Sequence, residues 1–346
     1  MRYLFLIILS SILLNASTPF RGVGTTALSY YYDKSAIDFI IQEKIPSVRI
    51  HIYILNTMKR LDVNSTEALR LNLRWSREIY QKLDDNNISS MITISDFPIN
   101  KIKCIDKKKP IYWSDKECIN QIYNIVKKTV NEFNGTNLIG YEFLGEPVVL
   151  KNHKSLEPSN WNSVFKNIIK ITRKIDKDKY LFYSVAPWAI ASHYRKVKPF
   201  NDNKIIYNAH MYQPHKYTHQ KVRNIKEAYS YPLWLWFKRW DKDKLYEQLK
   251  PLIDFGKKYN KPISISEFSV ILWAENSNKY LQDLLEIFNK NSISWYYFNI
   301  GSIYKGWDCR YIGSVDNKFH KHYIYEGNQS KRFKLLNRYF RDIKNP

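Results

Sequence analysis

Short β-type runs alternate with longer helical stretches along almost the whole chain. The runs are rich in β-branched or aromatic side chains, as buried strands are. Between them, apolar residues recur at three- and four-residue spacing, which indicates amphipathic helices. The runs cover residues 25–30, 47–52, 89–94, 138–143, 180–185, 204–208, 262–266 and 294–298. The helical stretches cover residues 68–83, 118–133, 161–175, 244–259, 280–289 and 330–343.

This alternation predicts an α/β fold, a (β/α)8 TIM barrel, with an open doubly wound sheet as the alternative. Residues 17–346 suffice for one large α/β domain. No Pro-, Gly- or Ser-rich linker and no short repeat interrupts them. We therefore expect a single domain and, since no heptad stretch demands a partner, a monomer.

The first residues indicate export. Met1-Arg2 precede an apolar run over residues 3–14, followed by small and polar residues. The run is short for a membrane span and is typical of a secretory signal peptide, which we place at residues 1–16. No later stretch is long and apolar enough for a membrane helix, so we expect a secreted or periplasmic protein.

The net charge bears on the binding partner, and the cysteines bear on disulfide bonds. The net charge of +23 suits an anionic partner, but the lysines are scattered and no nucleic-acid-binding motif accompanies them. An acidic polysaccharide or envelope surface is favoured over nucleic acid. Cys104 and Cys118 flank a Lys-rich loop and are expected to form a disulfide, the alternative being three buried thiols.

Polar side chains gather where the predicted strands end. Glu146 follows the fourth strand in Gly140-Tyr141-Glu142-Phe143-Leu144-Gly145-Glu146-Pro147, and Glu267 ends the seventh. Catalytic residues of parallel barrels are displayed at these strand ends. Paired carboxylates there suggest hydrolysis of a sugar bond, in which one is the proton donor and the other the nucleophile or base.

Together with Arg49 on the second strand, His210 and Tyr212 after the sixth and Trp295 on the eighth, this set resembles glycoside hydrolase family 5. That family contains cellulases and mannanases and belongs to the clan of retaining barrel glycosidases. The resemblance covers most of the chain after residue 16. It implies that Glu146 is the acid/base, neutral near working pH, and that Glu267 is the ionised nucleophile. It also implies a carboxyl separation of about 5 to 5.5 Å.

The resemblance assigns roles to the neighbouring residues too. Arg49 would keep Glu267 anionic and oriented. The alternative is that Arg49 neutralises Glu142, which lies on the same strand face as Glu146. Tyr212 would donate a hydrogen bond to Glu267.

For two further residues, a functional role and a structural role are both open. His210 would contact Glu146 or a sugar hydroxyl, or be an ordinary loop histidine. Trp295 would form the floor beneath the reacting sugar, or pack in the core.

The chain departs from the family pattern at two points. Gly145 stands where the family usually has an asparagine that contacts the sugar 2-hydroxyl. The usual histidine after the third strand is also missing, and Asp96 stands in that region. Asp96 is expected to fill part of that role or to contact a different sugar substituent.

Several tryptophans follow barrel strands and are candidates for stacking on sugars. The alternative is that they anchor long loops. These candidate sugar platforms are Trp188, Trp234, Trp236 and Trp273.

We predict no metal site and no cofactor. His210, His215 and His219 lack a metalloprotease motif, and Pro214 argues against a helix that would bring them together.

The sequence thus predicts an exported retaining β-glycosidase that acts on a glucan, mannan or related polysaccharide. The alternative is a catalytically weak barrel that binds glycans at a cell surface.

Overall fold

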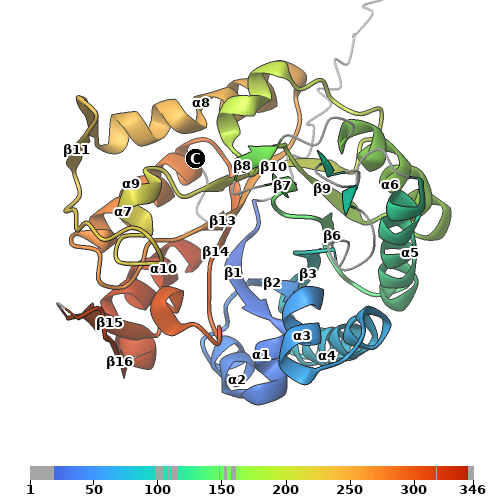
Figure 1. Ribbon diagram of the computed structural model, residues 1–346, viewed down its shortest axis with the longest axis horizontal. Coiled ribbons are helices and arrows are strands. Elements are labelled where there is room, and N and C mark those ends of the chain that lie inside the picture. The colour runs from blue at the N-terminus through green and yellow to red at the C-terminus, as the bar shows by residue number, and fades with distance from the viewer. Residues whose placement is uncertain are drawn as a thin grey trace, which may run out of the picture.

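Eight strands form a closed parallel barrel (Figure 1). Neighbouring strands follow the order β1, β2, β3, β6, β9, β10, β13 and β14, and β14 pairs again with β1. Because the first strand is paired on both sides, the sheet has no free edge, which confirms the (β/α)8 barrel and excludes the doubly wound sheet. The strands are β1 Arg21–Thr26, β2 Ser47–Ile52, β3 Ser89–Ile94, β6 Gly140–Phe143, β9 Tyr180–Ser184, β10 Ile205–Met211, β13 Ile263–Phe268 and β14 Ser294–Tyr297.

The structure is a computed structural model. It describes residues 19–97, 105–106, 109–110, 116–147, 149–151, 154–156, 161–316 and 318–341. The predicted signal peptide at residues 1–16 and Cys104 lie outside these ranges. Cys118 is disulfide-bonded, whereas Cys309 is a free and buried thiol. The pairing of Cys104 with Cys118 stays a prediction.

Helices surround the barrel (Figure 1). In the described ranges none of them is long and apolar enough to cross a bilayer. They are α1 Ala27–Tyr32, α2 Ser35–Gln42, α3 Ile54–Leu61, α4 Ser65–Asp84, α5 Lys116–Phe133, α6 Trp161–Ile175, α7 His215–Thr218, α8 Lys242–Tyr259, α9 Ser277–Lys290 and α10 Lys331–Arg341.

The first strand begins and ends earlier than predicted. Residues 25–30 were expected to form it, but the strand ends at Thr26 and a helix starts at Ala27. The Thr26 hydroxyl accepts a hydrogen bond from the backbone N–H of Ser29 at 3.0 Å, which caps the helix. This cap outweighs the strand preference of the tyrosines that follow.

Strand alternation divides the side chains between the interior of the barrel and the helices around it. Inside, an apolar layer of Met91, Phe182, Ile206 and Tyr296 lies toward the N-terminal ends of the strands. Toward the C-terminal ends the interior becomes polar, and the candidate site residues lie there. A larger apolar core fills the space between the strands and the helices.

Small hairpins follow the barrel strands, on the side where the strands end. They are β4 Ile105–Asp106 with β5 Lys109–Pro110, β7 Val149–Lys151 with β8 Lys154–Leu156, β11 Leu233–Leu235 with β12 Lys238–Trp240, and β15 Tyr311–Val315 with β16 Lys321–Tyr325.

Candidate active site

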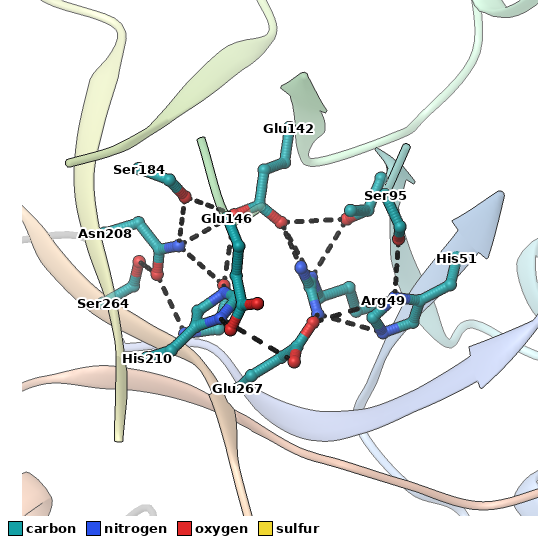
Figure 2. A network of polar contacts seen from close by, with 12 residues as sticks. Arg49, His51, Ser95, Glu142, Glu146, Ser184, Asn208, His210, Ser264 and Glu267 are labelled. Atoms are coloured by element: carbon teal, nitrogen blue, oxygen red, sulfur yellow. Dashed lines mark hydrogen bonds and ion pairs between the residues drawn. The ribbon is translucent and has the colours of Figure 1, made fainter. Parts of the chain in front are cut away.

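The structure brings four of the predicted polar residues into one network at the C-terminal ends of the strands (Figure 2). Arg49 comes from β2, His210 from β10 and Glu267 from β13, and Glu146 lies three residues past the end of β6. Distant segments of the chain thus converge because a parallel barrel gathers its strand ends on one face.

A local irregularity in β13 aims Glu267 into the network. Ser264 and Ser266 both contact Asn208 inside the barrel, so strict alternation would turn Glu267 outward. The pairing of β13 with β14 shifts register between Ile265 and Phe268. Such a bulge re-aims a side chain, here that of Glu267.

Arg49 joins two carboxylates. Its Nη1 lies 2.6 Å from Glu267 Oε1, and its Nε and Nη2 lie 2.8 and 2.5 Å from Glu142 Oε2. The sequence left two partners open for Arg49, and both contacts are present. Arg49 and Glu142 have no exposed side-chain surface, whereas the Glu267 side chain is 13% exposed.

The second oxygen of Glu142 is also satisfied. Glu142 Oε1 accepts hydrogen bonds from Ser184 Oγ and Asn208 Nδ2, both at 2.8 Å. A buried carboxylate needs such partners. Glu142 is therefore a structural anchor for Arg49, which in turn contacts the more exposed Glu267.

Mutual attraction keeps these three groups charged. Burial alone would lower the pKa of Arg49, but Glu142 and Glu267 raise it. Burial would raise the pKa of Glu142, but Arg49 and His210 lower it. Burial would also raise the pKa of Glu267, but the positive charges of His210 and Arg49 lower it. This carboxylate is therefore ionised.

His210 lies between the two predicted catalytic glutamates. Its Nδ1 is 3.0 Å from Glu146 Oε1 and 3.7 Å from Glu267 Oε2, and its Nε2 is 3.1 Å from Ser266 Oγ. Burial alone would lower the pKa of His210, but Glu267 and Glu146 raise it. Of the two contacts predicted for His210, the one to Glu146 is present.

The two predicted catalytic carboxylates are close. One ligand-type atom from each of Glu146, His210 and Glu267 lies within 4.8 Å of the other two, so a carboxylate oxygen of Glu146 is that near to one of Glu267. These atoms would suit a cation, but the raised pKa of His210 favours an imidazolium, which cannot be a metal ligand. The Glu146 side chain is 38% exposed, against 13% for Glu267.

Tyr212 completes the contacts of Glu267. Its hydroxyl donates to Glu267 Oε2 at 3.2 Å, as predicted. Burial, and next the charge of Glu267, raises the pKa of Tyr212 well above its ordinary value, so the phenol keeps its proton. The Tyr212 ring meets His219 edge-on at 5.3 Å, and His219 packs on Trp307 at 4.7 Å, so an aromatic wall extends from the network.

Sequence reasoning missed His51. Its Nε2 lies 2.9 Å from Arg49 Nη1 and its Nδ1 lies 3.0 Å from Ser95 Oγ. Burial, and next the charge of Arg49, lowers the pKa of His51 well below its ordinary value, so the ring is neutral. The signal was available, because His51 is two residues after Arg49 and so on the same strand face.

Trp295 is not the sugar platform that we predicted. It is fully buried, and its ring stacks on Phe340 of α10 at 5.3 Å. Its neighbour Tyr296 faces the barrel interior, so alternation turns Trp295 toward the helices. From the end of β14, it is Phe298, half-buried just past the strand, that reaches the network, and its ring meets His51 edge-on at 5.5 Å.

Asp96 has a structural role, and its predicted sugar contact stays a prediction. Its Oδ1 accepts hydrogen bonds from the backbone N–H groups of Ile54 and Leu55 at 2.7 and 3.1 Å, at the start of α3. Burial raises the pKa of Asp96 to about 6, although these bonds oppose the shift. The carboxylate therefore caps a helix.

The glycine before Glu146 fits the packing of the network. A Cβ added at Gly145 would lie 2.9 Å from Arg49 Nη2 and 3.4 Å from a ring carbon of His210. Arg49 and His210 thus occupy the space beside residue 145, and a side chain there would require Arg49 or the backbone to shift.

The four candidate sugar platforms differ in their exposure to solvent. Trp188 is half-buried, and so is Trp273, whose Nε1 donates to the carbonyl of Gln220 at 2.9 Å. Trp234 and Trp236 are exposed on the β11–β12 hairpin.

The expectation that Pro214 would keep His215 and His219 apart was wrong. Pro214 precedes α7 instead of interrupting it, and the two rings stack at 3.9 Å. Burial lowers the pKa of both histidines, that of His219 to about 3.

Fold and site together define a parallel (β/α)8 barrel with paired carboxylates at the C-terminal ends of its strands. Residues 14–303 match the family Cellulase (glycosyl hydrolase family 5). Because this match spans most of the chain, the protein belongs to glycosyl hydrolase family 5, and the predicted resemblance is confirmed.

Named relatives agree with this placement. The chain is 26% identical over 203 residues to Endoglucanase C of Acetivibrio thermocellus, a match that covers 50% of this chain and 57% of that protein. The chain thus spans little more than half the length of that relative.

Among solved structures, the fold resembles Cel5A of Thermotoga maritima in complex with cellobiose, with a TM-score of 0.65 and 18% identity over 91% of this chain and 97% of that one. It also resembles the cellulose synthase subunit Z of Clostridioides difficile, with a TM-score of 0.67 and 16% identity over 91% and 99% of the two chains. At these identities the likeness shows the shared fold.

Proposed function

We propose that this protein is a retaining β-glycoside hydrolase that cleaves a polysaccharide through a covalent glycosyl-enzyme intermediate. The observation that carries the proposal is the approach of Glu146 and Glu267 to within 4.8 Å, with Glu267 held ionised. Retaining enzymes place their carboxyl groups about 5–5.5 Å apart, and inverting enzymes about 6.5–9.5 Å apart to admit a water. The spacing here supports the retaining class.

Glu267 acts as the nucleophile in this mechanism. Arg49 Nη1 and the Tyr212 hydroxyl each hold one of its oxygens, which orients the carboxylate toward the anomeric carbon. Attack forms a glycosyl ester and expels the leaving oxygen.

Glu146 acts as the acid and then as the base. It is the more exposed of the pair, as a residue that must meet both the leaving group and an incoming water should be. It protonates the leaving oxygen in the first step and takes a proton from water in the second. His210, at 3.0 Å from Glu146, fixes its orientation.

The relatives support a substrate class for this proposal. Endoglucanase C is named for glucan cleavage, and Cel5A has been solved with cellobiose and with mannotriose. A β-linked glucan or mannan-like polysaccharide is therefore the substrate class that we propose. The apolar run at residues 3–14 supports export of the protein to such a polymer outside the cell.

The test is hydrolysis of a panel of β-linked polysaccharides and aryl glycosides by the wild type, Glu146→Ala and Glu267→Ala. Glu132→Ala, at an exposed position on α5, is the matched control. We expect the wild type and the control to be active and both site variants to lose activity. Azide should restore Glu267→Ala and give a glycosyl azide of inverted configuration.

Two outcomes would contradict the proposal. Site variants as active as the wild type would show that the glutamates are not catalytic. A wild type that binds a glycan without cleaving it would favour a glycan-binding barrel, in which Gly145 in place of the family asparagine accounts for the lost activity.

A further inference from the structure

The β11–β12 hairpin presents aromatic side chains to solvent. Trp234 is 68% exposed, Trp236 is 78% exposed and Phe237, at the tip, is 99% exposed. Soluble proteins seldom expose such side chains together unless the patch binds something. The glycosidase mechanism uses none of these three residues, so the inference that follows does not depend on the proposed function.

The hairpin is anchored at its base. Leu233 is buried, and the hydroxyl of the neighbouring Tyr231 donates to Asp283 of α9 at 2.9 Å. At the other end Asp241 caps α8 by accepting from the backbone N–H of Lys244 at 3.2 Å. The aromatic tip is therefore held out from the body of the protein by fixed ends.

Cations accompany the exposed rings. Trp234 pairs across the hairpin with Arg239, and Lys238 directly follows the tip. The ammonium group of Lys216 lies 5.2 Å from the centre of the Trp236 ring. Arg239 Nε lies 3.2 Å from Asp241 Oδ2, so Lys216 and Lys238 make the patch cationic, on a chain whose net charge is +23.

We infer that the β11–β12 hairpin is an anchor for an anionic lipid surface, into which Trp236 and Phe237 insert at the headgroup level. Tryptophan and phenylalanine favour the membrane interface, and neighbouring Lys and Arg are attracted to anionic lipids. Charge complementarity thus selects the occupant.

Shape argues against a polysaccharide at this tip. Ligand sites are concave and surround the ligand with converging polar groups. A side chain that is 99% exposed stands on a convex tip, and its nearest polar neighbours in sequence, Lys238 and Arg239, are cations. A second copy of the chain would bring the same positive charge to the contact and be repelled.

The experiment is co-sedimentation with vesicles made of equal parts phosphatidylglycerol and phosphatidylcholine, and with vesicles of phosphatidylcholine alone. The chain is used from residue 17, because the apolar residues 3–14 would bind vesicles by themselves. The variants are the double change Trp236→Ser with Phe237→Ser, and Lys238→Gln. Their controls are Tyr32→Ser, an aromatic residue 52% exposed on α1, and Lys59→Gln, an exposed lysine on α3.

We expect binding to the anionic vesicles that weakens at high salt. The double variant should bind at least about ten-fold more weakly, and Lys238→Gln roughly five-fold more weakly, while both controls bind as the wild type does. All of these positions are exposed, so the thermal unfolding of each variant should match that of the wild type.

Three results would overturn the inference. The first is no binding to anionic vesicles at low salt, and the second is equal binding by the double variant and the wild type. The third is that the double variant keeps vesicle binding but loses adsorption to insoluble glucan, or dissociates a dimer seen with the wild type. In that case the occupant would be a polysaccharide or a second copy.

Discussion

At the residue scale, two glutamates contact the same arginine but differ in their burial and in their contacts. Glu142 is fully buried and holds Arg49 by two contacts, whereas Glu267 takes one contact and is partly open to solvent. The buried acid maintains the charge of Arg49, and the partly exposed acid is the nucleophile that we propose.

This difference predicts that Glu142→Gln mainly lowers stability, whereas Glu267→Gln mainly removes activity. Glu142→Gln should lower the free energy of unfolding by about 3–5 kcal/mol, because it leaves a buried cation with half of its pairing. Glu267→Gln should abolish hydrolysis at a smaller cost in stability, because Arg49 keeps Glu142. Urea denaturation and rate measurements on both variants check this. Equal losses of stability would contradict the assigned roles.

The position of His210 between two carboxylates predicts a pH-dependent contribution to stability. Its folded-state pKa is raised, so the folded protein binds that proton more tightly than the unfolded chain, in which the ring titrates near 6.5. The stabilisation is complete below pH 6.5 and is lost as the pH rises through the folded-state pKa.

His210→Gln should therefore lower the free energy of unfolding most near about pH 6 and least near about pH 9. Urea denaturation across this range measures the difference, with the exposed His322→Gln as the control. A difference that grows toward alkaline pH would show that the ring is neutral in the folded protein.

At the scale of single elements, β14 separates two aromatic residues that the sequence alone did not distinguish. Trp295 packs on α10, and Phe298 reaches the active-site network just past the strand end. Removing the first side chain should therefore affect stability, and removing the second should affect activity.

Trp295→Ala should lower the free energy of unfolding by about 3–5 kcal/mol and leave the KM of the folded protein unchanged. Phe298→Ala should change stability less and raise KM or lower kcat. Thermal unfolding and steady-state kinetics separate the two effects. A raised KM in folded Trp295→Ala would restore it as a sugar platform.

Element boundaries were predictable where the side-chain pattern was regular. The strands at residues 47–52 and 89–94 and the helix at 161–175 coincide with their predicted ranges, because their apolar patterns are unbroken. The first strand was misplaced because a cap at Thr26 outweighed the local preference for strand. Trp295 was misassigned because residue type does not show which face of a strand a side chain takes.

At the scale of the whole molecule, α10 closes the structure beyond the family match, which ends at residue 303. Arg332 of this helix is buried, and its Nη1 and Nη2 donate to the carbonyl of Val270 at 2.6 Å and to Ser277 Oγ at 2.8 Å. The helix thus holds the segment that follows β13.

Arg332→Ala should destabilise the protein by about 1–3 kcal/mol for each buried acceptor left unpaired, whereas Lys334→Ala, exposed on the same helix, should have little effect. Thermal unfolding of the two variants measures this. Equal melting temperatures would mean that α10 contributes little to the barrel.

The order of polar residues along the chain predicted the barrel and most of its site, because strand ends converge in any parallel barrel. It did not predict His51, the capping role of Asp96 or the reach of Phe298. These depend on side-chain directions and on the geometry of short loops, which only the assembled structure fixes.

The retaining mechanism is the central claim, and trapping the intermediate tests it most directly. The wild type is incubated with an activated 2-deoxy-2-fluoro glycoside of the sugar that it hydrolyses, and its peptides are examined by mass spectrometry. We predict one glycosyl adduct on Glu267 and none in Glu267→Gln. An adduct on Glu146, or hydrolysis with an inverted first product and no adduct, would contradict the proposed mechanism.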